Sequence, residues 1–124
     1  MFSYKKKYFL IIQSIYDINL NNIKANNKFF IIYRNHKTKE KLSEILKFRN
    51  KCKLKKFLFF VANNIVLARL LNSDGIYISS WNTSIKPSYF RHLNKSIIGS
   101  AHSVREITSK FNQGYNYVLV SKLF

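Results

Sequence analysis

Six short runs of apolar residues, almost without interruption, recur along the chain and constrain its fold more than any other feature. Strands with one solvated face alternate polar and apolar residues, whereas strands covered on both faces are apolar throughout. The segments between the runs carry helical patterning or capping signals, so strands and helices alternate, as in parallel sheets of βα units. We therefore predict an α/β protein with parallel strands at residues 8–12, 29–33, 57–62, 76–78, 97–98 and 117–120.

Four of the intervening segments predict helices, at residues 38–53, 65–71, 87–93 and 103–114. The first helix has a charged side that we expect to be an ordinary solvated face, and an apolar side formed by Leu42, Ile45, Leu46 and Cys52. Pro87 suits the first position of the third helix. Ser103 and Glu106 form a capping box for the fourth, which ends at Gly114. The first crossover, residues 17–27, is only weakly helical.

The chain is strongly basic, with 22 Lys and Arg against 5 Asp and Glu and a formal net charge of +17. This balance raises the question of nucleic-acid binding. The lysines, however, are spread along the chain among many asparagines, and no aromatic–basic motif of the usual RNA-binding modules is present. We therefore favour a basic surface that attracts phosphorylated ligands over a nucleic-acid-binding protein.

Cysteine usage and the N-terminal sequence bear on the compartment. Cys52 is the only cysteine, so the chain has no disulfide framework, in keeping with a reducing compartment. The first apolar run stops at Gln13, too short for a signal sequence or a membrane span. We expect a cytoplasmic protein without a membrane segment, folded as one domain over residues 1–124.

The stretch Gly99-Ser100-Ala101-His102-Ser103 follows a predicted strand and opens a predicted helix. In parallel α/β sheets, ligands bind beyond the carboxyl ends of the strands. We expect Gly99 to allow a close approach of the backbone to a ligand, and Ser100 and His102 to point toward that ligand. The helix that follows would favour an anion at its N-terminus.

Three motifs carry a family resemblance: Asn-Ser-Asp-Gly-Ile-Tyr-Ile at 72–78, Ile-Gly-Ser-Ala-His-Ser at 98–103 and Gly-Tyr-Asn-Tyr-Val at 114–118. In order and spacing, this set resembles the thiamine-phosphate synthase and thiazole tautomerase family. The resemblance implies a TIM barrel, of which 124 residues supply about six parallel βα units, and hence an incomplete barrel. It implies a transferase that joins hydroxymethylpyrimidine diphosphate to thiazole phosphate carboxylate and releases pyrophosphate.

The resemblance also suggests the residues that bind substrate. The synthases end their second strand in Gln-Leu-Arg-Glu-Lys, which holds the pyrimidine diphosphate, and here the segment is Ile-Tyr-Arg-Asn-His at 32–36. Arg34 is kept, His36 takes the place of the lysine, and Lys37 stands beside it. Ser100 matches the serine of the family's fifth strand. The implied partners are therefore phosphorylated pyrimidine and thiazole compounds.

The metal-binding positions depart from the family. Where the family has two magnesium aspartates, this chain has Asn63 and Asn82. Magnesium prefers charged oxygen ligands, so we expect it to be held weakly. This favours an alternative, a tautomerase in which His102 transfers the proton, because an imidazole titrates near neutral pH. A non-catalytic relic that binds only phosphate is a further alternative.

The segment that resembles the family reaches only the sixth of the family's eight strands. Two open strand edges and uncovered apolar faces favour aggregation. We expect either a C-terminally truncated fragment, or a homo-oligomer or other partner that completes the barrel, or closure into a smaller open sheet.

Overall fold

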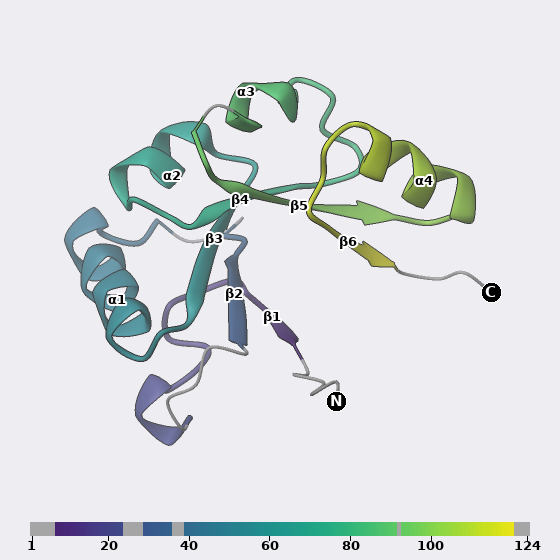
Figure 1. Ribbon diagram of the computed structural model, residues 1–124. Helices are drawn as coiled ribbons and strands as arrows, with labels where there is room; N and C mark the ends of the chain where they lie inside the picture. Colours follow the sequence, from purple (N-terminus) through teal and green to yellow (C-terminus); the bar gives the residue numbers. More distant parts are fainter. Residues whose placement is uncertain (1–6, 24–28, 36–38, 92, 121–124) are drawn as a thin grey trace.

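A computed structural model describes residues 7–23, 29–35, 39–91 and 93–120. They form one parallel sheet of six strands in the order β1-β2-β3-β4-β5-β6, curled into part of a barrel (Figure 1). The fold is thus an α/β half-barrel of the TIM type, as predicted. The strands are β1 Tyr8–Ile12, β2 Phe29–Tyr33, β3 Leu58–Ala62, β4 Gly75–Ile78, β5 Ser96–Ala101 and β6 Tyr117–Val120.

The helices lie on the convex side of the curled sheet (Figure 1). They are α1 Leu42–Leu54, α2 Ile65–Leu70, α3 Ser88–Arg91 and α4 Val104–Asn112. The first crossover forms only a 3-10 turn, η1 Leu20–Asn22, within its described part. The first helix begins at Leu42, and the side chain of Lys41 makes no capping hydrogen bond there. No helix in the described ranges has both the length and the apolar character needed to cross a bilayer.

Alternate side chains of the strands pack on opposite faces of the sheet. Toward the helices, Ile31 and Phe59 belong to a buried cluster with Cys52 of α1. A second outer cluster lies farther along the sheet, around Ile76 and Ile97. Toward the barrel interior, the buried cluster comprises Phe30, Ile32, Phe60, Tyr77 and Ile98. Both faces of the strands are therefore covered, which explains their uninterrupted apolar sequences.

The two edge strands approach each other across the interior face. The ring of Tyr117 on β6 lies 5.5 Å from that of Phe9 on β1 and 5.2 Å from that of Phe30 on β2. The Lys7 amine donates a hydrogen bond of 3.1 Å to the Tyr117 hydroxyl. Side chains, rather than strand pairing, thus link the ends of the sheet.

The charged side of α1 is not wholly solvated, contrary to the sequence prediction. Arg49 is only 6% exposed, and it donates hydrogen bonds to the carbonyls of Leu71 and Asn72 at 3.3 and 3.0 Å. It also forms an ion pair of 3.5 Å with Asp74, just before β4. Leu42, predicted to lie on the apolar side, is 40% exposed. The helix therefore packs partly through a long-range ion pair that its periodicity does not reveal.

Candidate functional site

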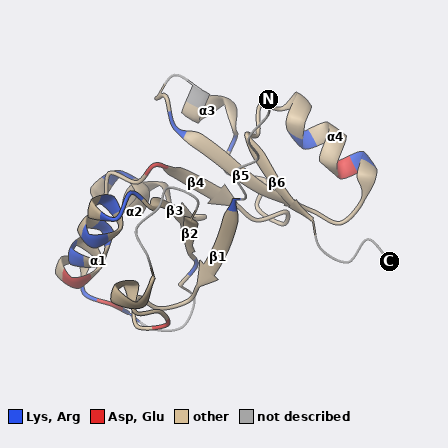
Figure 2. Ribbon diagram, turned by 60° about the horizontal axis from the view of Figure 1, so that its bottom comes forward, with Lys and Arg blue, Asp and Glu red and all other residues tan. Residues whose placement is uncertain are grey.

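The carboxyl ends of the strands form one edge of the half-barrel, and the polar side chains that follow the strands gather there. None of the six strands contains a charged residue. Figure 2 shows Lys and Arg prominent along α1. The edge is therefore built largely from hydroxyl and amide groups.

Asn63, the first residue after β3, joins the ends of two neighbouring strands. Its φ of 58° is left-handed, a conformation that Asn tolerates better than most residues. Its side-chain oxygen accepts hydrogen bonds from Ser79 N at 2.9 Å and from Asn82 Nδ2 at 3.2 Å. Its Nδ2 donates to Ser79 Oγ at 2.8 Å. Asn63 and Asn82, far apart in sequence, are thus in direct contact.

A second set of contacts extends this network to β5. Ser80 N donates to Ser100 Oγ at 3.2 Å. Ser80 Oγ lies 3.4 Å from Nε2 of His102, within hydrogen-bonding distance. His102 N also donates to Glu106 at 2.7 Å, while Glu106 N donates to Ser103 Oγ at 3.2 Å, so the predicted cap of α4 is present. The imidazole therefore lies beside the β4 loop at the start of a capped helix.

Arg34, the first residue after β2, contributes a positive charge beside the inner-face residue Tyr77. Its guanidinium lies 5.8 Å from the centre of the Tyr77 ring, within the range of a cation–π contact. Its Nε is buried and has no hydrogen-bond partner. A buried donor without an acceptor is costly, so a ligand oxygen at this point would be stabilising.

A separate cluster is centred on the carboxylate of Glu40. It accepts hydrogen bonds from Ser14 Oγ at 2.9 Å, Ile15 N at 3.1 Å, the Tyr33 hydroxyl at 2.6 Å and Asn35 Nδ2 at 3.2 Å. Burial alone would raise the pKa of Glu40, but these hydrogen bonds outweigh it and hold the pKa below its usual value. Burial, together with the contact to Glu40, raises the pKa of Tyr33. The cluster fixes the loops that follow β1 and β2.

The structure places five of the six predicted site residues at this edge. They are Arg34, Asn63, Asn82, Ser100 and His102, on or after β2, β3, β4 and β5. His36 lies outside the described residues, as do its neighbour Lys37 and His92. The roles of all six residues in binding or catalysis stay predictions.

Gly99 has a different role from the one predicted. A Cβ atom at this position would lie 2.4 Å from the ring of Tyr115 and 3.2 Å from Cδ of Lys110. The close approach that Gly99 permits is therefore to an aromatic ring beneath α4, on the outer face.

Two aromatic residues near the end of β4 differ in exposure. Trp81, in the loop after β4, is 67% exposed, whereas Tyr77 is buried at 4% exposure.

Sequence analysis missed Ser79 and Ser80, which connect the two halves of the network. Ser79 is only 2% exposed and contacts Asn63 through both its N–H and its hydroxyl. The available signal was their position: two hydroxyl residues directly after a buried strand. Glu40 was missed because it lies within the predicted helix at residues 38–53, whereas the observed helix begins only at Leu42. Its partners, Ser14, Ile15, Tyr33 and Asn35, come from other segments.

The side chains at the magnesium positions do not fit a magnesium ion. The oxygens of Asn63 and Asn82 are already engaged as hydrogen-bond acceptors. The described part of the chain contains no group of three or more His, Cys, Asp or Glu residues that could hold a metal ion. We therefore derive no catalytic step through this ion.

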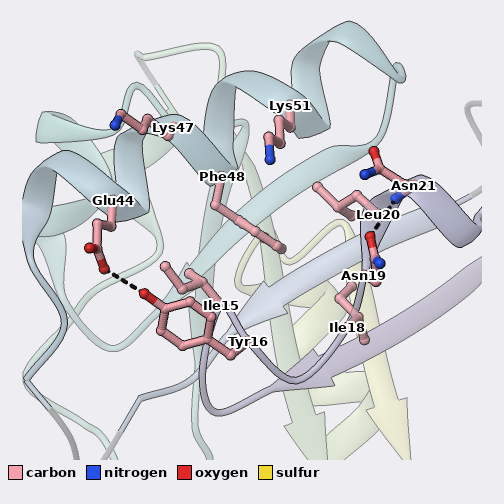
Figure 3. Close-up of a pocket in the computed structure, with 10 residues that line it drawn as sticks. All are labelled: Ile15, Tyr16, Ile18, Asn19, Leu20, Asn21, Glu44, Lys47, Phe48 and Lys51. Carbon is pink, nitrogen blue, oxygen red and sulfur yellow. Dashed lines mark hydrogen bonds between the residues drawn. The ribbon is translucent and has the colours of Figure 1, made fainter.

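A cavity in the described part of the chain lies away from the network. It has a volume of about 470 Å³ and lies between the first crossover and α1 (Figure 3). Ile15, Leu20 and Phe48 give it an apolar floor, and Tyr16 donates a hydrogen bond of 2.6 Å to Glu44 at its side. This hydrogen bond raises the pKa of Tyr16. The cavity belongs to the outer layer, and none of the five described site residues lines it.

A half-barrel of βα units with a polar carboxyl edge defines a TIM-barrel-type α/β protein with its site at the strand ends. A model of the family described as thiamine monophosphate synthase matches residues 13–124 of this chain. The chain belongs to this family, which confirms the resemblance found in the sequence.

One solved structure supports the fold. The chain is similar to thiamine phosphate pyrophosphorylase from Pyrococcus furiosus, with a TM-score of 0.70 and 18% sequence identity. The match covers 96% of this chain and 61% of that protein, so the chain spans less than two thirds of its length. At this identity the likeness establishes the fold alone. No curated protein matches the sequence.

Proposed function

We propose that the chain is a thiamine-phosphate synthase-like protein that binds hydroxymethylpyrimidine diphosphate at the carboxyl edge of its sheet. The observation that carries this proposal is the continuous network from Asn82 through Asn63 and Ser79 to the Ser80–Ser100 contact. It extends over the ends of three adjacent strands, where ligands of parallel α/β proteins bind. Arg34 lies at the end of the next strand along.

Arg34 supplies the charge that a diphosphate requires. Its position beside Tyr77 and the unpaired, buried Nε favour an anionic oxygen acceptor. Hydrogen bonds between a guanidinium and phosphate are short and strong because both groups are charged. Pyrophosphate leaves as an anion when the carbon–oxygen bond breaks, and Arg34 would stabilise this developing charge. Ser100 would contact the pyrimidine or the diphosphate from the β5 side.

Incubation of the protein with both thiamine precursors tests the proposal, with release of pyrophosphate and formation of thiamine phosphate as readouts. Arg34→Gln should weaken binding of the pyrimidine diphosphate about tenfold or more, through loss of a charge-assisted contact. Arg69→Gln is the matched control, because Arg69 is exposed in the last turn of α2, away from the carboxyl edge. Equal affinity of the two variants would contradict the role of Arg34.

A second candidate, favoured by His102, is isomerisation of the thiazole phosphate carboxylate. His102 lies beside the Ser80 hydroxyl, and this reaction requires neither a diphosphate nor a metal ion. Its test is the thiazole compound supplied alone. Isomerisation that disappears in His102→Asn would support the tautomerase, whereas turnover that needs both precursors would support the synthase.

A further inference from the structure

Asn63 follows β3 and Asn82 lies in the loop after β4, and their side chains belong to one hydrogen-bond network. Asn82 Nδ2 donates a hydrogen bond of 3.2 Å to Asn63 Oδ1. Because the backbone N–H of Ser79 can only donate, the atom of Asn63 that faces it at 2.9 Å is the oxygen. Ser84 N can likewise only donate, so the atom of Asn82 that faces it at 3.1 Å is also the oxygen.

Neither amide oxygen has a lone pair left for a cation. An amide oxygen has two lone pairs. That of Asn63 accepts from Ser79 N and from Asn82 Nδ2. That of Asn82 accepts from Ser84 N and also from Ser84 Oγ, at 2.6 Å. A cation would have to displace these donors and would then face the amino groups of the same amides.

The electrostatic setting also opposes a divalent cation. The formal net charge of the chain is +17, and none of Asn63, Ser79, Asn82 and Ser84 can carry a negative charge. Magnesium is usually bound through one or two carboxylates and keeps several of its waters. Here the strand ends are joined by neutral hydrogen bonds, which need no counter-charge.

We infer that the hydrogen-bonded Asn63–Asn82 pair replaces a bridging metal ion and makes this edge independent of divalent cations. The inference deepens the proposed function and rests on it for the ligand: the anionic part of the substrate would be held by side chains such as Arg34, without a metal ion. For the chain itself it predicts that two carboxylates at these positions would create a cation site.

Titration with Mn²⁺, a paramagnetic substitute for Mg²⁺, tests the inference without any substrate. Electron paramagnetic resonance measures the free ion, and the melting temperature is recorded with and without Mg²⁺. Asn63→Asp/Asn82→Asp should bind Mn²⁺ about tenfold or more tightly than the unmodified chain. It should also gain melting temperature with Mg²⁺, because the ion relieves repulsion between the facing carboxylates.

The matched control is Asn64→Asp/Asn116→Asp, which adds the same charge elsewhere. Asn64 and Asn116 each accept a backbone N–H through the side-chain oxygen, at 3.0 and 2.8 Å, a role that aspartate also fills. This control should bind Mn²⁺ no better than the unmodified chain. If the paired aspartates prevent folding, Asn63→Asp alone keeps every hydrogen bond that Asn63 accepts and should bind Mn²⁺ more tightly than Asn64→Asp.

Two results would overturn the inference. One is an unmodified chain that binds Mn²⁺ as tightly as the aspartate variants. The other is precursor binding or turnover by the unmodified chain that is lost in a chelator, which would support the proposed function while contradicting its metal independence. Conversely, a failure to bind either precursor would contradict the proposed function, and the Mn²⁺ titration would still decide the inference.

Discussion

The amino ends of the strands form one edge of the sheet and the carboxyl ends form the opposite edge. Different kinds of contact link neighbouring strands at these two edges. At the amino edge, Asp74 pairs with Arg49 and accepts a hydrogen bond of 2.8 Å from Phe59 N, and the amine of Lys95 donates to Ser73 O at 2.7 Å. At the carboxyl edge, Asn63 and Ser79 are joined by neutral hydrogen bonds.

This difference separates stability from function. A buried charge that loses its partner is strongly destabilising, so ion pairs of this kind tie the fold together. Neutral amides and hydroxyls can exchange partners with water or a ligand at little cost where they are open to solvent. We therefore expect substitutions at the amino edge to act mainly on folding, and those at the carboxyl edge mainly on binding.

The two strand glycines give the largest predicted effect. A Cβ atom at Gly75, on the amino side, would lie 1.9 Å from the carbonyl oxygen of Ser96, which is backbone and cannot rotate away. Gly75→Ala should lower the free energy of unfolding by about 3 kcal/mol or more. Gly99→Ala meets the ring of Tyr115, a side chain that can shift, and should cost about 1–2 kcal/mol. Urea denaturation measures both, and equal losses would contradict the comparison.

Arg49→Ala comes next in size. It removes two hydrogen bonds to carbonyls and leaves Asp74 without its ion-pair partner. Because the side chain of Asp74 is 32% exposed, water compensates part of the loss, and we expect about 2–3 kcal/mol. Arg105→Ala, on an exposed face of α4, should change stability by less than about 0.5 kcal/mol. A similar loss of unfolding free energy in Arg49→Ala and Arg105→Ala would show that the buried position of Arg49 is unimportant for stability.

Glu40 is an exception to the difference between the two edges, because it is a charged carboxylate at the otherwise largely neutral carboxyl edge. The substitution Glu40→Gln tests its contribution to stability. The pKa of Glu40 lies below its ordinary value of 4.5 in the folded chain. Its stabilising effect is therefore complete above pH 4.5 and is lost as the pH falls through the lowered pKa. The variant should lose about 1–2 kcal/mol at neutral pH.

The pH dependence provides the control for this prediction. Unfolding free energies measured between neutral and acidic pH should converge for Glu40→Gln and the unmodified chain, since the protonated carboxyl resembles the amide. Parallel curves with a constant difference would mean that Glu40 acts through packing, and not through its charge.

The positions of the strands could be predicted from the sequence better than the side-chain contacts between distant elements. Uninterrupted apolar runs locate five of the six strands to within one residue at each end, because burial on both faces leaves no other pattern. β5 is longer than predicted, since Gly99 and Ser100 belong to the strand although neither is a strand former. Arg49 was misjudged because its partner, Asp74, lies 25 residues away and helical periodicity contains no such information.

For the candidate site, too, the general position could be predicted better than the side-chain contacts. Parallel strands share one carboxyl edge, so Arg34, Asn63 and Ser100 could be expected at the same edge from topology alone. The contact between Asn63 and Asn82 could not be predicted, because it depends on the left-handed backbone of Asn63 and on the intervening Ser79. Side-chain networks depend on such local conformations, which the strand pattern does not specify.

Ser100→Ala should have the smallest effect on stability and thereby tests the comparison most directly. The lost contact is a single hydrogen bond of 3.2 Å from Ser80 N, at a half-buried position where water can replace the hydroxyl. The free energy of unfolding should change by less than about 0.5 kcal/mol. Binding of hydroxymethylpyrimidine diphosphate, measured by calorimetry, should weaken about threefold to tenfold if Ser100 contacts this ligand. Ser109→Ala, which removes an exposed hydroxyl that contacts Gln113 at 3.0 Å, should change neither quantity. A loss of stability as large as that of Arg49→Ala would mean that the carboxyl edge, too, is built for folding, and the proposed division between the edges would fail.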